Sequence, residues 1–347
     1  MKNLFASLLF VLAFVASHLG AAQTIRRVNN TGLTIAGVNI YTTLQAAHDA
    51  ASSGDIIYLE PSDISYGNLT CVRPLTIIGN GYFLDQNPSL QLDKRESIVG
   101  TINFANGSAG SRITGCVPSA IYAGASNLTI ERNHITSQFY TGYNSAIGSV
   151  AASNIIFRQN YLDGQFYFYQ GGATTAVSNV NVTNNYIGGG ISVPSGQYIY
   201  MSNVLISNNV IGTLAGTNGA GIQVDNSVIK NNILTYTAAS ANFTPRNNAY
   251  SYNISGNTAF GTANGNQQNI TPTNLFVGGT ASTDGAFQLR TGSPAIGAGE
   301  SGTDVGMFGS VLPYRVAGIP NVPSIYQYNQ AVSGNSLNAT ISTRSNN

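Results

Sequence analysis

The residues best suited to acid–base chemistry are the carboxylates in the central part of the chain, and they are few. Between residues 126 and 259 the only acidic residues are Glu131, Asp163 and Asp225. A glycosidase needs two carboxyl groups facing each other across the bond that it cleaves. These three occupy different positions relative to a repeated asparagine, so the sequence predicts no catalytic residue. Glu131 aligns with Arg158 of the next repeat, which we interpret as a structural ion pair, with a catalytic pair as the alternative.

One short segment, residues 85–96, is dense in charge and is the candidate metal site. It contains Asp85, Asp93 and Glu96 together with two basic residues. The segment interrupts the apolar strands, so we expect a loop. Because hard cations prefer carboxylate oxygens, two interpretations remain open: a solvated loop, or a calcium or substrate site built by these carboxylates. The spacing matches no EF-hand pattern, and we predict no cofactor.

The sequence does not support a nucleophilic mechanism. His48 and His134 have no serine or cysteine partner at a spacing typical of a nucleophile and its base. Cys71 and Cys116 lie 45 positions apart and show no metal-binding spacing. We interpret both cysteines as structural, either joined in a disulfide or as two small buried side chains.

Aromatic residues are the candidates for ligand binding. His134, Tyr161 and Tyr186 share the outward position directly after the repeated asparagine, and Tyr140 and Tyr167 share another, seven residues after it. Stacked in space, such rings would form a flat track on which the C–H faces of sugar rings can pack. The alternative is ring-on-ring stacking that only stabilises the fold.

The segments that must position these residues are repeats. The ten residues SNLTIERNHI, which begin at Ser126, return in five later copies, the last of which begins at Tyr250. The second asparagine of each copy recurs at intervals of 23 to 27 residues. We predict that these asparagines form a structural ladder: Asn133, Asn160, Asn185, Asn209, Asn232 and Asn257.

Within each copy apolar and polar residues alternate, which is the periodicity of a strand. One apolar column runs from Ile130 to Ile254 and another from Ile135 to Ala259. A single copy cannot bury its own apolar side, so successive copies must stack. The predicted fold is all-β, a right-handed parallel β-helix. Asparagine suits its bends because it tolerates left-handed backbone angles and its amide can pair with an identical neighbour.

The ends of such a coil need caps. Residues 42–51 predict a short N-terminal capping helix that starts at Thr42 or Thr43 and stops before Gly54.

Lys2 and the apolar run after it are typical of a secretory signal peptide. The expected divisions are a signal peptide (1–22), an N-terminal strand and capping helix (23–55), the β-helix (56–275), a C-terminal coil or cap (276–312), and an extension that packs along the coil or is mobile (313–347).

Composition narrows the choice of partners. Only 8% of the residues are charged, and removing Lys2 with the signal leaves 13 basic residues (14 minus 1) against 13 acidic ones. A formally neutral chain gives no electrostatic reason to expect nucleic acid or anionic lipid. No segment after residue 22 is apolar and long enough to span a membrane.

The segment LQAAHDAASSGDIIYLEPSDISYGNLTCVRPLTIIGNGY, residues 44–82, resembles the opening of pectate-lyase-like β-helix proteins. Residues 287–306 resemble the closing segment of secreted bacterial members, so the resemblance covers about residues 40–312. It implies the fold more than an activity, because that superfamily includes lyases, hydrolases, esterases and non-enzymes. For a member that is a lyase, it implies bound calcium.

From these observations we expect an exported bacterial β-helix protein, secreted or at the cell surface. Its expected partner is a polysaccharide or cell-surface glycan, contacted without evident catalysis. Two alternatives remain open: a polysaccharide lyase or glycoside hydrolase of the pectate-lyase-like type, and a purely structural surface protein.

Overall fold

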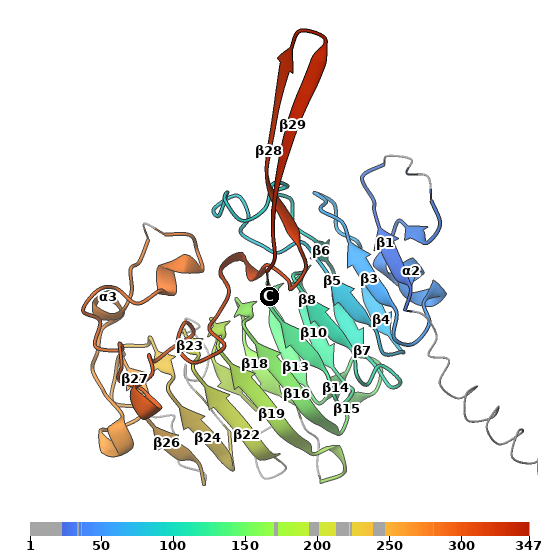
Figure 1. Cartoon of the computed structure of the whole chain (residues 1–347). Helices are drawn as coiled ribbons and strands as arrows, with labels where there is room; N and C mark the ends of the chain where they lie inside the picture. Colours follow the sequence, from blue (N-terminus) through green and yellow to red (C-terminus); the bar gives the residue numbers. More distant parts are fainter. Residues whose placement is uncertain are drawn as a thin grey trace, which may run out of the picture.

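The computed structural model describes residues 23–32, 35, 37–169, 173–193, 201–212, 222, 224–238, 247–279 and 281–346. The predicted signal peptide, residues 1–22, lies outside the described residues. The described part consists mainly of strands in three long parallel sheets, which give the molecule a solenoid-like form (Figure 1). None of its helices is both long and apolar enough to cross a membrane.

The three sheets are numbered in the order in which the central part of the chain passes through them. Sheet 1 contains, in spatial order, β2 (Ile40–Tyr41), β1 (Ile25–Val28), β3 (Ile56–Leu59), β5 (Thr76–Ile78), β8 (Arg112–Thr114), β11 (Thr129–Glu131), β16 (Ala152–Arg158), β19 (Val177–Thr183), β22 (Met201–Ser207), β24 (Ser227–Lys230) and β26 (Ala249–Ser251). Sheet 2 contains β12 (His134–Ile135), β17 (Tyr161–Leu162), β20 (Tyr186–Ile187), β23 (Val210–Ile211), β25 (Ile233–Leu234) and β27 (Ile254–Ser255). Sheet 3 contains β4 (Leu69–Cys71), β7 (Ile102–Phe104), β10 (Ala120–Ala123), β13 (Gln138–Thr141), β18 (Phe166–Phe168) and β21 (Ile191–Ser192).

Each central turn of the chain passes once through each sheet. The path runs from β11 to β12 to β13, then from β16 to β17 to β18, and then from β19 to β20 to β21. Equivalent strands of neighbouring turns pair in parallel. In two successive early turns, β6 (Ile98–Val99) lies between β5 and β7, β9 (Val117–Pro118) lies between β8 and β10, and the two strands pair in parallel.

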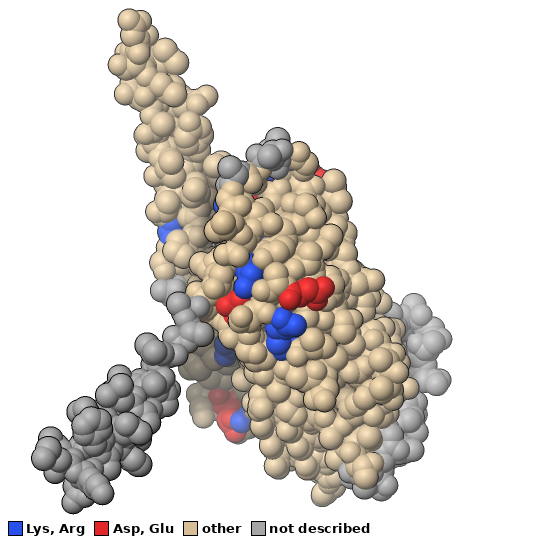
Figure 2. Space-filling view, turned by 90° about the vertical axis from the view of Figure 1, so that its right-hand side faces the viewer, with Lys and Arg blue, Asp and Glu red and all other residues tan. Residues whose placement is uncertain are grey.

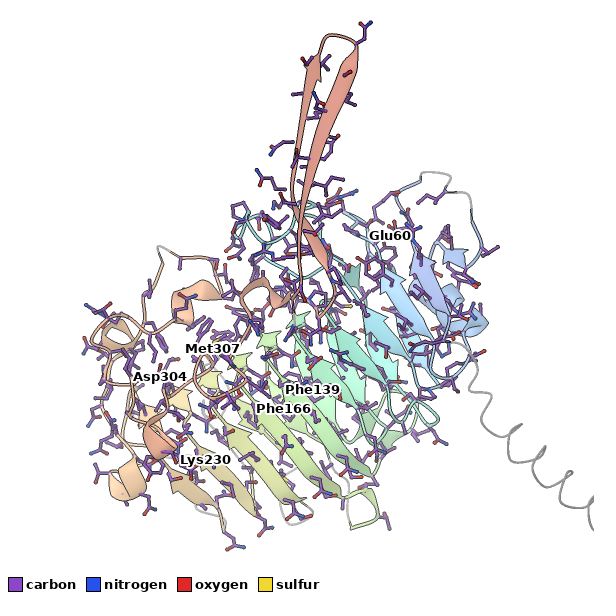
Figure 3. All side chains as sticks on the ribbon, in the orientation of Figure 1. Glu60, Phe139, Phe166, Lys230, Asp304 and Met307 are labelled. Carbon is purple, nitrogen blue, oxygen red and sulfur yellow. The ribbon has the colours of Figure 1, made fainter. Side chains whose placement is uncertain are left out.

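The predicted alternation of strand residues places the core inside the coil. Ile130, Phe157 and Val182 are paired neighbours in sheet 1 and are fully buried. Phe139 and Phe166 face inward from sheet 3, with ring centroids 4.8 Å apart (Figure 3). Burying apolar side chains contributes on the order of 2 kcal/mol each, so the stacked columns supply most of the stabilisation.

The asparagine ladder exists, but its sixth residue differs from the prediction. The backbone N–H of Asn232 donates to Oδ1 of Asn253, not to Asn257, at 3.0 Å. Ile254 therefore pairs with Ile233 in sheet 2 and does not continue the column of Ile130. The interval from Asn232 to Asn253 is 21 residues, and the ladder continues to Asn266, 13 residues further on. The sequence alignment chose the wrong asparagine because this copy is shortened before its strand.

The left-handed backbone angle also lies one residue earlier than predicted. Arg132, Gln159, Asn184, Asn208 and Asn231, each directly before a ladder asparagine, have φ between 54° and 56°. The ladder asparagines are buried and bond to one another instead, with backbone N–H to Oδ1 distances of 2.8–3.0 Å. In each turn, one residue thus adopts the left-handed angle of the bend, and the asparagine after it makes the hydrogen bonds of the ladder.

The first turn is covered by the helix α2 (Leu44–Ala50), which packs against β1, β3 and β4. Thr43 is its N-cap, and the Thr43 side chain accepts a hydrogen bond from the N–H of Ala46. Leu44 and Ala47 are the residues of this helix that are fully buried against the coil. His48 is buried as well, and its Nε2 accepts from the N–H of Val72 at 3.1 Å, which gives this histidine a structural role.

Past the last turn the chain reverses along the outer side of sheet 2. We call residues 300–322 the return segment; it runs from the end of the coil that carries β27 back toward the early turns (Figure 1). Its backbone carbonyls accept hydrogen bonds of 2.5–3.3 Å from side chains on successive turns. The donors are the left-handed residues Arg132, Gln159, Asn184 and Asn208.

The chain then forms an antiparallel hairpin of β28 (Ser324–Ser333) and β29 (Ser336–Arg344), which projects away from the coil (Figures 1 and 2). Most of its residues are exposed, and only its last strand residue, Arg344, is charged. The hairpin touches the body at its base, where the N–H of Leu92 donates to the carbonyl of Ile325. Residues 313–322 pack on the coil, whereas the hairpin contacts the body through its base, at Ile325 and Arg344.

The remaining elements are short. β14 (Tyr143–Asn144) and β15 (Gly148–Ser149) form a small antiparallel hairpin beside sheet 3. Cys71 and Cys116 are both buried and are not joined in a disulfide. The short helices are η1 (Ala173–Thr175), η3 (Ala263–Gly265), α3 (Pro272–Leu275), η4 (Gly285–Phe287), η5 (Glu300–Gly302) and η6 (Val316–Gly318).

Candidate functional site

Five tyrosine rings gather on the outer face of sheet 3, and we call this group the tyrosine face. Tyr122, Tyr140 and Tyr167 are paired neighbours on β10, β13 and β18, so their rings form one column across three turns. The ring centroids of Tyr140 and Tyr167 are 4.9 Å apart and nearly parallel, at 19°. Tyr143 and Tyr169 lie beside the column: each is within 6.2 Å of Tyr140.

Strand geometry explains why these rings face outward. On β13 and β18 the inward residues are Phe139 and Phe166, and the next residue of each strand must point to the opposite side. All five tyrosines are half-buried, because each ring is covered on its sides by its neighbours and open toward solvent. Two strand spacings give the column a length of about 10 Å.

Two glutamines provide the polar part of this face. The hydroxyl of Tyr140 donates to Oε1 of Gln138, and the hydroxyl of Tyr167 donates to Oε1 of Gln165. Within the described part of the chain, neither glutamine amide nitrogen has a hydrogen-bond partner on the protein. The face therefore combines flat apolar rings with uncommitted amide N–H donors.

Two tyrosines of this face, Tyr140 and Tyr167, have raised pKa values. Burial raises the pKa of Tyr140 to about 12, and the neighbouring tyrosines Tyr167 and Tyr122 add to the effect. Burial likewise raises the pKa of Tyr167. Both groups are neutral hydrogen-bonding groups at any pH at which the protein works.

The second predicted aromatic column, His134, Tyr161 and Tyr186, lies on the outer side of sheet 2. Its rings do stack, since Tyr161 and Tyr186 are 4.4 Å apart at 22°. However, Phe287 stacks on Tyr186 at 4.4 Å, and Phe83 packs against His134 at 4.7 Å. Tyr161 is only 6% exposed. The column is covered by segments that are distant in sequence, so it does not offer an open track.

His134 has a carboxylate partner that the sequence spacing did not reveal. Its Nε2 lies 2.9 Å from Oδ2 of Asp163 on the next turn. Glu96 is close enough to His134 for the histidine to lower its pKa, although burial dominates and raises the pKa of Glu96 overall. Tyr82 packs against the same imidazole at 5.6 Å.

The segment 85–96 does not bring its three carboxylates together. Asp93 pairs with Arg95 at 2.6 Å, which is the main reason that its pKa is lowered. Glu96 accepts a hydrogen bond from the N–H of Phe83 at 2.6 Å, and Asp85 is exposed. No group of three or more potential metal ligands occurs among the residues that the structure describes.

The predicted pair of Glu131 and Arg158 is present as part of a three-residue clamp. Arg158 binds Oε2 of Glu131 at 2.6 Å, and Arg112 binds Oε1 from the preceding turn at 2.7 Å. The Glu131 side chain is 1% exposed and each arginine side chain 33% exposed. Because both carboxylate oxygens are engaged, the clamp is structural.

Two of the five tyrosines, Tyr140 and Tyr167, were predicted from the sequence, whereas Tyr122, Tyr143 and Tyr169 were not. Tyr122 belongs to a turn without the repeated asparagine, so no alignment places it above Tyr140. Tyr143 and Tyr169 follow Tyr140 and Tyr167 by three and two residues, respectively. Because these two spacings differ, the repeat alignment does not relate Tyr143 to Tyr169. The high local density of tyrosine in both segments is the sequence feature that indicates them.

Comparison with known proteins adds no assignment to this geometry. No family model matches the chain, and no curated protein or solved structure matches it either.

Proposed function

We propose that this chain is an exported protein, a right-handed parallel β-helix, that binds an uncharged glycan on its tyrosine face. The observation that carries the proposal is the in-register column of Tyr122, Tyr140 and Tyr167 on the outside of sheet 3. Aromatic faces are apolar surfaces on which the C–H faces of sugar rings pack. A column about 10 Å long suits a run of sugar rings better than a single one.

The polar groups of the face favour a neutral ligand. Gln138 and Gln165 offer amide N–H donors beside the rings, and sugar hydroxyls can accept from them. Ser192, the outward neighbour of Tyr167, is also uncharged, and Asn103, the neighbour of Tyr122 at the other end, is uncharged and buried. Without a cation on this face, a uronate or sulfated chain would gain no charge pairing there.

The proposal is tested by glycan-array binding followed by calorimetry on the best neutral ligand. We expect Tyr140→Ala/Tyr167→Ala to weaken binding by about tenfold or more, since it removes two stacking surfaces of about 1 kcal/mol each. Tyr140→Phe/Tyr167→Phe keeps the rings and should retain most of the affinity. Tyr328→Ala, an exposed tyrosine on the hairpin, is the matched control. Unchanged affinity in the alanine double variant would refute the tyrosine face.

A lyase or hydrolase is the second candidate, and the close placement of His134, Asp163 and Glu96 favours it. The resemblance to pectate-lyase-like proteins points in the same direction. Incubation with pectin and alginate, with and without calcium, tests this candidate. Release of unsaturated or reducing ends that stops in His134→Asn would replace the binding proposal with an enzymatic one.

A further inference from the structure

A cavity of about 300 Å³ lies at the base of the hairpin, away from the tyrosine face. It is bounded by segment 85–96, the return segment, the end of β29 and one turn of the coil. Three arginines from distant parts of the chain line it, and none of the lining residues is acidic. The complete lining is Leu90, Arg132, Arg315, Val316, Ile319, Arg344, Ser345 and Asn346.

Arg132 is a fixed and buried part of this cavity, with 6% of its surface exposed. Its Nε donates to Oε1 of Gln159 at 2.9 Å, and its Nη1 donates to the carbonyl of Ile319 at 3.0 Å. Burial lowers the pKa of Arg132 to about 10; Glu131 opposes this, whereas Arg315 adds to the lowering. A guanidinium whose charged form is disfavoured in this way gains when an anion arrives.

Arg344 gives a second and independent sign of a missing partner. Its guanidinium donates to the carbonyl of Ser89 and lies 4.8 Å from the centre of the Tyr326 ring. Its Nε is buried yet has no hydrogen-bond partner within the described part of the chain. A buried N–H without an acceptor destabilises the protein, and an acceptor oxygen in the cavity would remove that cost.

We propose that this cavity binds an oxyanion of the sulfate or phosphate type, either free or as an ester on a small molecule. Guanidinium groups match such oxyanions with pairs of parallel N–H···O bonds. Three arginine side chains line one volume in which no lining residue is acidic, so an entering oxyanion would meet guanidinium groups and no carboxylate of the lining. The apolar wall of Leu90, Val316 and Ile319 would contact the carbon skeleton of an ester.

The test is calorimetric titration of the full chain at low ionic strength with sodium sulfate, sodium phosphate, a sugar phosphate and a sulfated monosaccharide. We expect saturable binding of at least one of these. Tighter binding of an ester than of the free ions would identify the ester as the source, and equal binding would identify the free ion. Either result supports the cavity as an oxyanion site, and no binding at millimolar concentration overturns the proposal.

Variants separate this site from non-specific attraction. Arg315→Gln/Arg344→Gln should weaken binding about tenfold or more, since each arginine supplies charge-assisted hydrogen bonds. Arg344→Lys keeps the charge but loses the forked donor pair, so an intermediate loss is expected. Arg290→Gln, an exposed arginine outside the lining, and Tyr140→Ala/Tyr167→Ala should bind as the wild type does. Equal binding by the arginine double variant and the wild type would refute the assignment.

Discussion

Glu131 shows how a single buried carboxylate can tie three turns together. Burial alone would raise the pKa of Glu131, but Arg112 and Arg158 outweigh it and hold the pKa below the ordinary value of 4.5. A carboxyl whose pKa is lowered by folding stabilises the protein above its ordinary pKa. That contribution is lost as the pH falls through the lowered value.

We therefore expect Glu131→Gln to reduce the free energy of unfolding by about 1–3 kcal/mol at pH 7, because the two arginines lose their counterion. The difference from wild type should shrink as the pH falls below 4.5, because protonation then favours the unfolded chain, whose Glu131 carboxyl has the higher pKa. Urea denaturation at pH 7 and at pH 3.5 measures both values. A constant difference between the two pH values would show that the clamp acts through packing and not through charge.

Glu96 is expected to respond to pH in the opposite direction. Burial raises its pKa, so its ionised form is less stable in the folded protein than in water. Glu96→Gln keeps an acceptor for the N–H of Phe83 and removes that charge. The variant should be more stable than wild type at pH 7, by an amount that falls toward zero at acid pH. Thermal melts across this range measure the trend, and a variant that is less stable at pH 7 would contradict it.

At the level of single residues, the sequence predicted the positions that recur in each repeat. It did not predict contacts that occur only once in the molecule. Tyr140 and Tyr167 were found because both follow a repeated asparagine by the same count. The pairing of His134 with Asp163 was missed because it joins two turns at unequal positions. The covering of Tyr161 by Phe287 depends on a contact across more than a hundred residues, for which a repeat pattern holds no information.

Among the elements of the fold, the buried asparagine ladder is the one whose disruption should reduce the free energy of unfolding most. Oδ1 of Asn185 accepts from the backbone N–H of Asn160, and its Nδ2 donates to the carbonyl of Phe157. Asn185→Ala leaves these buried groups without partners, so we expect a loss of about 3 kcal/mol in the free energy of unfolding. Asn181→Ala, at an exposed position of β19 in the same turn, is the matched control and should change it by less than about 0.5 kcal/mol. A loss of similar size in both variants would argue against the ladder.

The presence of the strands and of the capping helix could be predicted from the sequence, because both depend on local residue patterns. The period of two predicted the strands of sheets 1 and 2, and Thr43 before Leu44 predicted the start of α2. The return segment was not predictable in the same way. Its position depends on hydrogen bonds such as that from Asn184 to Met307, which link residues 123 positions apart.

For the molecule as a whole, the return segment changes how unfolding should proceed. In a simple solenoid each turn touches only its neighbours, so end turns can open independently. Here residues 300–322 touch turns from Tyr82 to Asn231, and the cluster beneath them includes Tyr161, Val210 and Met307. Opening any one of these turns disturbs contacts with the others.

We therefore expect the full chain to unfold in one calorimetric transition, with equal calorimetric and van't Hoff enthalpies. A chain truncated before residue 300 should melt at lower temperature and over a broader range. Separate transitions in the full chain would show that the return segment does not couple the turns. Hydrogen exchange would then locate the turn that opens first.

The return segment also sets an order on how the molecule is made. Tyr82 on an early turn meets its hydroxyl partner, Tyr314, only 232 residues later in the chain. Until Tyr314 is in place, Tyr82 and the outer side of sheet 2 lack the contacts that the return segment provides. A chain that lacks the return segment would leave apolar residues of sheet 2 uncovered, among them Val210 and Ile233.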